Sequence, residues 1–172
     1  MASRNPISIV NAINTVLEAD NNISLRTINS TSDYSETIST IFKKHLNIFD
    51  VTQTYEKNTL PKNPIITTFV HELQKERIST YQVYKRQKPL IMTEVCIINF
   101  DEEQAILDAM SLAEDIEESL EGFDNNERLV SLISNVARTM YVNKIERLGI
   151  LKYSETGFHG VCRLHYKIDY LK

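Results

Sequence analysis

Acidic side chains dominate one stretch of the sequence, residues 101–121. This stretch holds nine Asp or Glu residues and no Lys or Arg. Clustered carboxylates can bind a metal ion or serve as general acid and general base. Four of them are spaced along roughly one face of a predicted helix, opposite its apolar residues: Asp108, Asp115, Glu118 and Glu121. This spacing favours a solvated helix face, and an electrostatic docking surface ahead of a catalytic site.

A short segment rich in Lys and Arg offers the opposite charge. It spans residues 75–88 and contains five basic residues: Lys75, Arg77, Lys85, Arg86 and Lys88. Complementary charges on two surfaces favour a contact between them. The acidic helix face and this basic segment are therefore candidate docking surfaces for one another.

Two histidines near the C-terminus are the next candidates for chemistry. His159 and His165 fall on the same face of a predicted strand, with Arg163 between them. Six residues along a strand span about 20 Å, so the two imidazoles cannot bind one metal ion together. We interpret them as exposed strand positions. His71-Glu72 is not followed by a second His at the metalloprotease spacing.

The motifs of common enzyme families are absent from the sequence. There is no Gly-X-Ser-X-Gly elbow, no dinucleotide-binding fingerprint and no P-loop. Cys96 and Cys162 both fall in predicted strands, without a neighbouring His in the sequence. We expect both to be reduced thiols in the core. The sequence thus predicts no catalytic residue, no cofactor and no metal site, and we do not expect an enzyme.

Length and composition indicate one globular domain, residues 1–172. The hydrophobic fraction is 42%, which is ordinary for a globular protein. No apolar run approaches the roughly 20 residues of a membrane helix, and the N-terminus lacks the apolar region of a signal peptide. The net charge of −4 and the pI of 5.6 argue against binding nucleic acid by counterion release.

The N-terminal part, residues 1–78, is predicted to be largely helical. Asn5-Pro6 is typical of a helix start, and an apolar stripe follows: Ile9, Val10, Ile13, Val16 and Leu17. A short strand is expected at 24–30 and a loop at 47–62. Between them, Ser32 or Asp33 begins a second helix, whose stripe is Tyr34, Ile38, Ile41, Phe42 and Leu46. Asn63-Pro64 predicts a third helix over 65–73, although its β-branched residues leave a strand as the alternative.

The remainder, residues 79–172, is predicted to run β-β-α-α-β-β. A strand at 79–85 and a break at 86–89 precede a strand at 90–100, which is apolar on both faces, as a central strand should be. One face carries Met92, Cys96, Ile98 and Phe100; the other carries Ile91, Val95 and Ile97. One face can pack on helices, and the other needs a second cover, for which a neighbouring subunit is one candidate.

Two helices and a hairpin complete this pattern. Asp101 is expected to cap the first helix, which ends at Glu121-Gly122. Its predicted buried residues are Ala105, Ile106, Ala109, Met110, Ala113, Ile116 and Leu120. Asn125 or Asn126 begins the second helix, with Leu129, Leu132, Ile133, Val136 and Met140 facing inward.

The C-terminal hairpin joins strands at 144–153 and 158–170 through a turn at 154–157. The last strand alternates strictly between two faces over 13 residues, and Gly149 is a predicted bulge. The expected fold class is α+β, with an antiparallel sheet of two hairpins of mixed strand length packed by helices.

From residue 79 onward, the order of elements resembles the tail terminator, or tail completion, proteins of long-tailed bacteriophages. Tyr81-Gln82-Val83-Tyr84 and the strand at 91–100 are similar to that family's first hairpin. The segment 112–122 is similar to its helix, which ends in a Leu-acid-Gly motif, here Leu120-Glu121-Gly122. The segment 156–164 is similar to its turn into the last strand. The helical material from 32 to 73 departs from the family's single N-terminal helix.

The resemblance implies a structural protein of the virion, assembled in the host cytoplasm. The family forms a ring, usually a hexamer, at the head-proximal end of the tail tube, where it ends tube polymerisation and docks the neck or connector. Genome DNA passes through the ring without specific binding. The implied partners are other copies of the chain, the tail tube protein and the neck protein, and no membrane.

A ring of this kind needs two different surfaces on each subunit. The candidate interface residues are Lys85, Arg86, Lys88, Asp108, Asp115, Glu118, Ile91, Val95 and Ile97. Two alternatives stay open: another head-tail connector or neck protein, and a cytoplasmic α+β domain that binds a small ligand or regulates another protein.

Overall fold

The structure is a computed structural model that describes residues 6–20, 23, 41–42, 65–77, 85–154 and 157–171. Only the backbone is described for 41–42, 73–77, 85–87 and 151–154. In chain order the elements are α1 (Pro6–Ala19), β1 (Ile41–Phe42), β2 (Ile65–Arg77), β3 (Lys85–Asn99), α4 (Glu102–Glu121), α5 (Phe123–Ile133), β4 (Ala137–Ser154) and β5 (Gly157–Tyr170). The predicted α+β class is confirmed.

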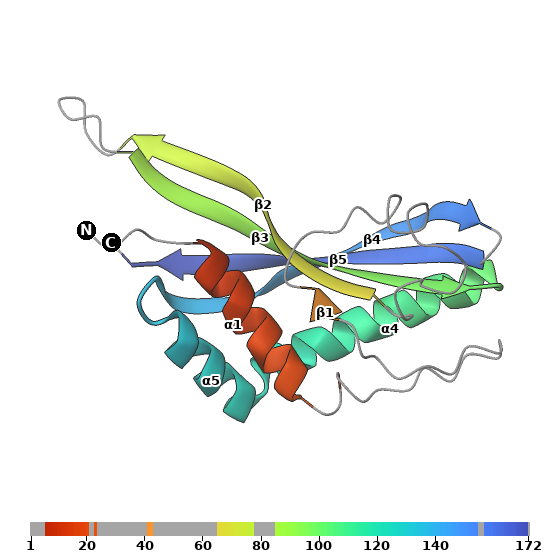
Figure 1. The fold of residues 1–172 in the computed structure, drawn as a ribbon, viewed down its shortest axis with the longest axis horizontal. Coiled ribbons are helices and arrows are strands. Elements are labelled where there is room, and N and C mark those ends of the chain that lie inside the picture. The colour runs from red at the N-terminus through yellow and green to blue at the C-terminus, as the bar shows by residue number, and fades with distance from the viewer. Residues whose placement is uncertain are drawn as a thin grey trace.

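Two antiparallel hairpins lie side by side in one sheet. β2 pairs with β3, β4 pairs with β5, and β3 joins the hairpins by pairing with β5, which gives the order β1-β2-β3-β5-β4. The short strand β1 adds to β2 in the parallel direction. The described helices α1, α4 and α5 lie together against one face of this sheet (Figure 1).

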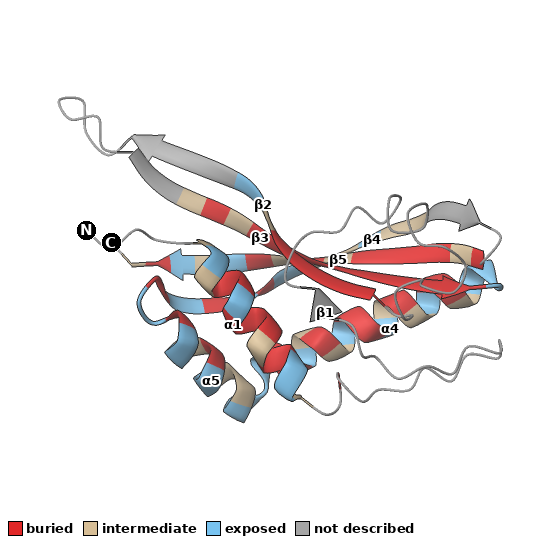
Figure 2. Ribbon diagram, viewed as in Figure 1, coloured by how far each residue is buried: buried red, intermediate tan, exposed pale blue. Residues whose placement is uncertain are grey.

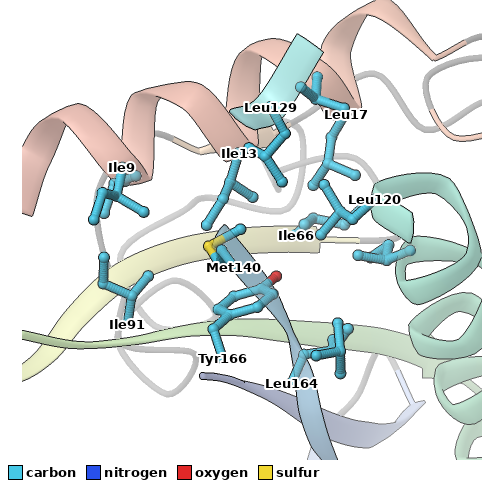
Figure 3. Close-up of a cluster of buried hydrophobic side chains, with 14 of the residues drawn as sticks. Ile9, Ile13, Leu17, Ile66, Ile91, Leu120, Leu129, Met140, Leu164 and Tyr166 are labelled. Atoms are coloured by element: carbon cyan, nitrogen blue, oxygen red, sulfur yellow. The ribbon is translucent and has the colours of Figure 1, made fainter. Parts of the chain in front are cut away.

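The main core fills the space between the sheet and the helices. Ile9, Ile13 and Leu17 of α1 and Leu129 of α5 point toward the strands, as Figure 3 shows. Residues from all four long strands meet them: Ile66 of β2, Ile91 of β3, Met140 of β4, and Leu164 and Tyr166 of β5. The predicted stripe of α1 is thus confirmed as the buried side of that helix.

Three hydroxyl groups cross this helix-facing side of the sheet. The Thr93 hydroxyl lies 2.9 Å from that of Thr68 and 2.7 Å from that of Tyr166, and all three are buried. Burial raises the pKa of the Tyr166 hydroxyl, so Tyr166 stays neutral and can act as a donor. Buried hydroxyl groups need hydrogen-bond partners. This row of three hydroxyls therefore favours the strand order β2-β3-β5.

Helix α4 contacts β5 more closely than an ordinary side chain would permit. A Cβ at Gly160 would lie 2.2 Å from the backbone oxygen of Ala105. The predicted N-cap is confirmed at the same end of α4, since Asp101 accepts a 3.0 Å hydrogen bond from the Gln104 N–H. The helix also ends at Glu121 before Gly122, as predicted.

The helix predicted over 65–73 is wrong, because this segment is the strand β2. The alternative, a strand, is confirmed: the β-branched residues Ile65, Ile66, Thr67 and Thr68 pair with β3. Ile41 and Phe42, predicted on a helix, form β1 instead. The other residues of that helix, the strand at 24–30, the loop at 47–62 and the residues that precede Lys85 in the predicted strand 79–85 lie outside the described residues.

The break predicted at 86–89 is also wrong, since β3 runs without interruption from Lys85. β5 pairs with β3 only from Met92 onward, so Pro89 lies at an edge of the sheet. Proline is tolerated at such an edge, and β3 can therefore include Pro89. The Pro89 oxygen accepts a 2.5 Å hydrogen bond from the Tyr170 hydroxyl. A side-chain contact therefore holds β5 to β3 where their backbones no longer pair.

The second helix of the core differs from the prediction at both ends. It begins at Phe123 rather than after Asn125, and it ends at Ile133. Val136 and Met140 are buried as expected, but Val136 lies in the turn before β4 and Met140 lies on β4. Leu132, predicted to face inward, is 44% exposed.

The C-terminal hairpin is confirmed, with both of its predicted glycine positions. Gly149 has φ 80 at an irregularity in the pairing of β4 with β5, and Gly157 has φ 125 at the start of β5. These are conformations that favour glycine. The partner strand β4 begins earlier than expected, at Ala137 rather than 144.

Candidate interaction surfaces

The outward face of α4 is acidic, but its residues differ from the predicted set. Glu118 and Glu121 are exposed, whereas Asp108 and Asp115 are only half-exposed on one flank of the helix. The Asp108 carboxylate accepts a 2.6 Å hydrogen bond from the Gln104 side chain. Two carboxylates that the sequence analysis left out, Glu103 and Glu114, are exposed. A helical-wheel count from the buried stripe would have selected them.

The C-terminal half of α4 concentrates like charges. Glu114, Glu117, Glu118 and Glu121 lie three or four residues apart, and the last turn carries no basic residue. Carboxylates at this spacing repel one another, and negative charge is unfavourable at a helix C-terminus. Burial, and then the negative charges of Glu121 and Glu114, raise the pKa of the Glu117 carboxyl. The Glu121 carboxylate has a structural role, because it accepts a 3.2 Å hydrogen bond from the Val142 N–H at the edge of the sheet.

The basic segment belongs to a two-stranded extension of the sheet. We call it the arm: residues 72–77 of β2 paired with 85–90 of β3, where β5 no longer pairs with β3. Figure 1 shows the arm projecting away from α4 and beyond the helix layer. Its paired backbone carries Lys75, Arg77, Lys85, Arg86 and Lys88, with Glu72 and Glu76 as its acidic residues.

The apolar interface candidates are part of the protein's own core. Ile91, Val95 and Ile97 are at most 1% exposed and pack in the cluster that contains residues of α1, α4 and α5. Cys96 and Ile98 on the opposite face of β3 are also buried, in a smaller cluster with Ile65 and Val161. β3 is buried at every position from Ile91 to Asn99, and Figure 2 shows this part of the strand in red. A neighbouring subunit is therefore not needed to cover this strand, and these three residues are removed from the candidate interface.

Charged residues lie in register across the sheet face that points away from the helices. Glu94 of β3 is opposite Arg163 of β5, which in turn is opposite Glu146 of β4. The Arg163 Nε donates a 2.9 Å hydrogen bond to the Glu94 Oε1, and its Nη2 makes an ion pair with the same oxygen. The Glu94 side chain is only 6% exposed. A buried charge of this kind needs its partner, so this pair has a structural role.

The two histidines of β5 do not occupy equivalent positions. His159 is fully buried, so its predicted exposure is wrong. The reason is that both sheet faces are covered near Gly157, where β5 is buried from His159 through Cys162. His165 is half-buried, and its Nε2 lies 2.7 Å from the Glu146 Oε2. The other Glu146 oxygen accepts a 3.1 Å hydrogen bond from the Lys144 ammonium. No local sequence pattern marks Glu94 or the contact of Glu146 with His165, because these contacts join residues on different strands.

We expect the Glu146 contacts to make stability depend on pH. Hydrogen bonds from His165 and Lys144 lower the pKa of the Glu146 carboxyl below its ordinary value of 4.5. A group with a lowered native pKa stabilises the fold above its unfolded pKa, and the effect is lost as the pH falls through the native value. Glu146→Gln should therefore lower the melting temperature at neutral pH and have little effect at pH well below 4.5. Glu127→Gln, at an exposed carboxylate of α5, is the control. A melting-temperature difference between wild type and Glu146→Gln that is equal at both pH values would contradict this reading.

Both cysteines are free and buried, as predicted. Cys96 pairs with Val161, and Cys162 pairs with Val95, so the two thiols lie on opposite faces of neighbouring strands. Burial raises the pKa of the Cys96 thiol to about 12 and that of Cys162 to about 11. The thiolate is the reactive form of cysteine. Because the raised pKa values keep both thiols protonated at neutral pH, these side chains serve as core residues.

Within the described part of the chain, no group of three or more His, Cys, Asp or Glu side chains is placed to hold a metal ion. None of the described helices is long and apolar enough to cross a membrane. The chain matches no protein-family model and no curated protein. The two charged surfaces that we consider as interaction sites are the arm and the acidic outward face of α4.

Proposed function

We propose that this chain is a structural protein of a bacteriophage virion, which forms a ring at the head-proximal end of the tail tube. There it ends tube polymerisation and provides the face on which the neck or connector docks. Its partners are further copies of itself, the tail tube protein and the neck protein. Genome DNA passes through the opening of the ring without specific contacts, and the chain performs no catalysis.

The observation that carries this proposal is the order of elements from β2 to the C-terminus. Two hairpins, β2-β3 and β4-β5, flank the helix pair α4-α5 and meet in one sheet. The resemblance to tail terminator proteins rests on the same order, but it takes the first strand from residues 79–85, whereas this hairpin is formed by β2 at 65–77 and by β3. The two motifs of that resemblance in the described part also occupy fitting places. Leu120-Glu121-Gly122 ends α4, and Gly157-Phe158 begins β5. Tyr81 to Tyr84 lie outside the described residues.

Charge and shape give further support. A ring that surrounds DNA should not hold the phosphates tightly, and a net charge of −4 fits that requirement. Head-to-tail contacts close into a ring when each subunit offers two different surfaces, and this chain carries a basic arm and an acidic helix at separate places. Glu94 and Arg163, which the sheet brings together, are paired with one another.

Native mass spectrometry of the purified full-length chain, with electron microscopy of the same sample, tests the proposal. We expect one discrete oligomer, six copies being the family's usual number, that appears as a closed ring. A monomer or dimer at every concentration would contradict the proposal and favour the α+β domain that binds a small ligand. A ring that binds a neck protein but not the tail tube would favour another connector of the same assembly.

A further inference from the structure

We propose that the arm of one subunit docks on the outward face of α4 in a second copy of this chain. The arm is residues 72–77 of β2 with 85–90 of β3, and the docking face centres on Glu114 and Glu118. The inference rests on the proposed ring, and it specifies which two surfaces form each contact.

The arm is a ribbon of two paired strands. Six consecutive pairs join its strands, from Glu72 opposite Leu90 to Arg77 opposite Lys85. Within the described ranges, no third strand pairs with either strand over this length. A two-stranded ribbon is only marginally stable in water. The Tyr170 contact to Pro89 anchors the base of the arm, so the outer part is what a partner would stabilise.

The face of α4 carries an unfavourable arrangement of charge. Its C-terminal half holds five carboxylates, which lie close enough to repel one another, against the helix dipole and without a basic residue in the last turn. Glu121 is engaged by the Val142 N–H. In the described part of the chain, neither Glu114 nor Glu118 forms an ion pair, and both are exposed. A cationic surface brought against them would relieve this repulsion.

The basic residues of the arm carry the complementary charge, but not for their own subunit. By the register of the pairing, Lys75, Arg77 and Lys85 share one face of the arm, whereas Arg86 and Lys88 share the other face with Glu72 and Glu76. Figure 1 shows the arm leaving the sheet at the end opposite to the one that α4 covers. An intramolecular contact is therefore out of reach, and a head-to-tail contact brings the two surfaces together between copies. The same contact repeats around a ring, so individually weak pairs act together.

Charge reversal with sedimentation velocity tests this contact. Arg77→Glu with Lys85→Glu reverses the basic face of the arm, and Glu114→Lys with Glu118→Lys reverses the helix face. We expect each double variant to shift the wild-type ring toward monomer, and the quadruple variant to recover much of the ring. Raising the salt concentration should weaken the wild-type ring, because exposed charges are screened beyond about 8–10 Å at physiological ionic strength. Arg138→Glu with Lys167→Glu, at exposed positions on β4 and β5, is the matched control and should leave the ring intact.

A fold measurement separates loss of contact from loss of structure. Placing Lys at 114 and 118 complements the helix dipole and removes like-charge pairs. That double variant should therefore keep or exceed the melting temperature of a dissociated wild-type subunit while it loses the ring.

Three outcomes would contradict the proposal. A ring that responds to neither reversal nor to salt would overturn the proposed contact but leave the proposed ring standing. A quadruple variant no better assembled than either double variant would also overturn the contact. A wild-type chain that never assembles would overturn the contact and the proposed function together.

Discussion

Gly160→Ala should be among the most destabilising single changes in the chain. The added Cβ would lie 2.2 Å from the Ala105 backbone oxygen, so α4 must move away from β5. Overpacking that forces a backbone shift typically costs about 1–3 kcal/mol. We place this change at the upper end, about 3 kcal/mol, because the clash is with a backbone atom, and each kcal/mol lowers the melting temperature of a domain of this size by about 2–4 °C. We therefore expect a fall of roughly 6–12 °C, measured by circular dichroism or calorimetry.

Gly122→Ala is the matched control for that change. Its φ of −58 is available to any residue, and its Cβ would lie 3.2 Å from the Glu118 oxygen. A neighbour must give way by only a few tenths of an ångström, so the cost should stay within about 1 kcal/mol. Equal melting temperatures for Gly160→Ala and wild type would mean that α4 does not pack against β5 at this point.

Ile97→Asp should cost still more, because it places a carboxylate in the main core. Ile97 is 1% exposed and packs in the cluster shared by the helices and the sheet. An unpaired buried charge costs several kcal/mol, about 4–5 or above, so the variant should be unfolded or insoluble at room temperature. Ile98→Asp tests the smaller cluster on the opposite face, where Ile98 is 9% exposed.

Two milder variants keep this prediction measurable. Ile97→Val should lower the free energy of unfolding by about 0.5–1.5 kcal/mol. Leu107→Asp, at a position on α4 that is 50% exposed, should have little effect. If Ile97→Asp and Ile98→Asp both remain soluble with the wild-type melting temperature, the central placement of β3 is wrong.

Local signals in the sequence were sufficient for several elements. The alternation along β5 predicted a strand, and Asp101 and Gly122 marked the two ends of α4 within a residue. Gly149 and Gly157 marked a bulge and a turn because glycine readily adopts positive φ. In each of these cases, the residue that determines the structure is close in sequence to the element it shapes.

Errors arose where distant contacts determine the structure. The segment 65–73 has apolar residues at spacings that suit a helix, yet pairing with β3 makes it a strand. His159 has the alternation of an exposed position, but that end of β5 is covered on both faces. The Glu94–Arg163 pair joins residues 69 positions apart, so no local pattern marks it. The charged surfaces were found from composition, but which carboxylates face outward depends on how α4 sits on the sheet.

The most direct test of the proposed function is the length of tail tubes assembled with and without this protein. Under the proposal, a tail tube protein is encoded in the same genome; it would be polymerised in vitro, and the full-length chain added during growth. We expect shorter tubes, each carrying a ring at one end only, in negative-stain electron micrographs. Tubes of unchanged length without a terminal ring, from a chain shown to be folded, would contradict the proposal that it ends tube polymerisation.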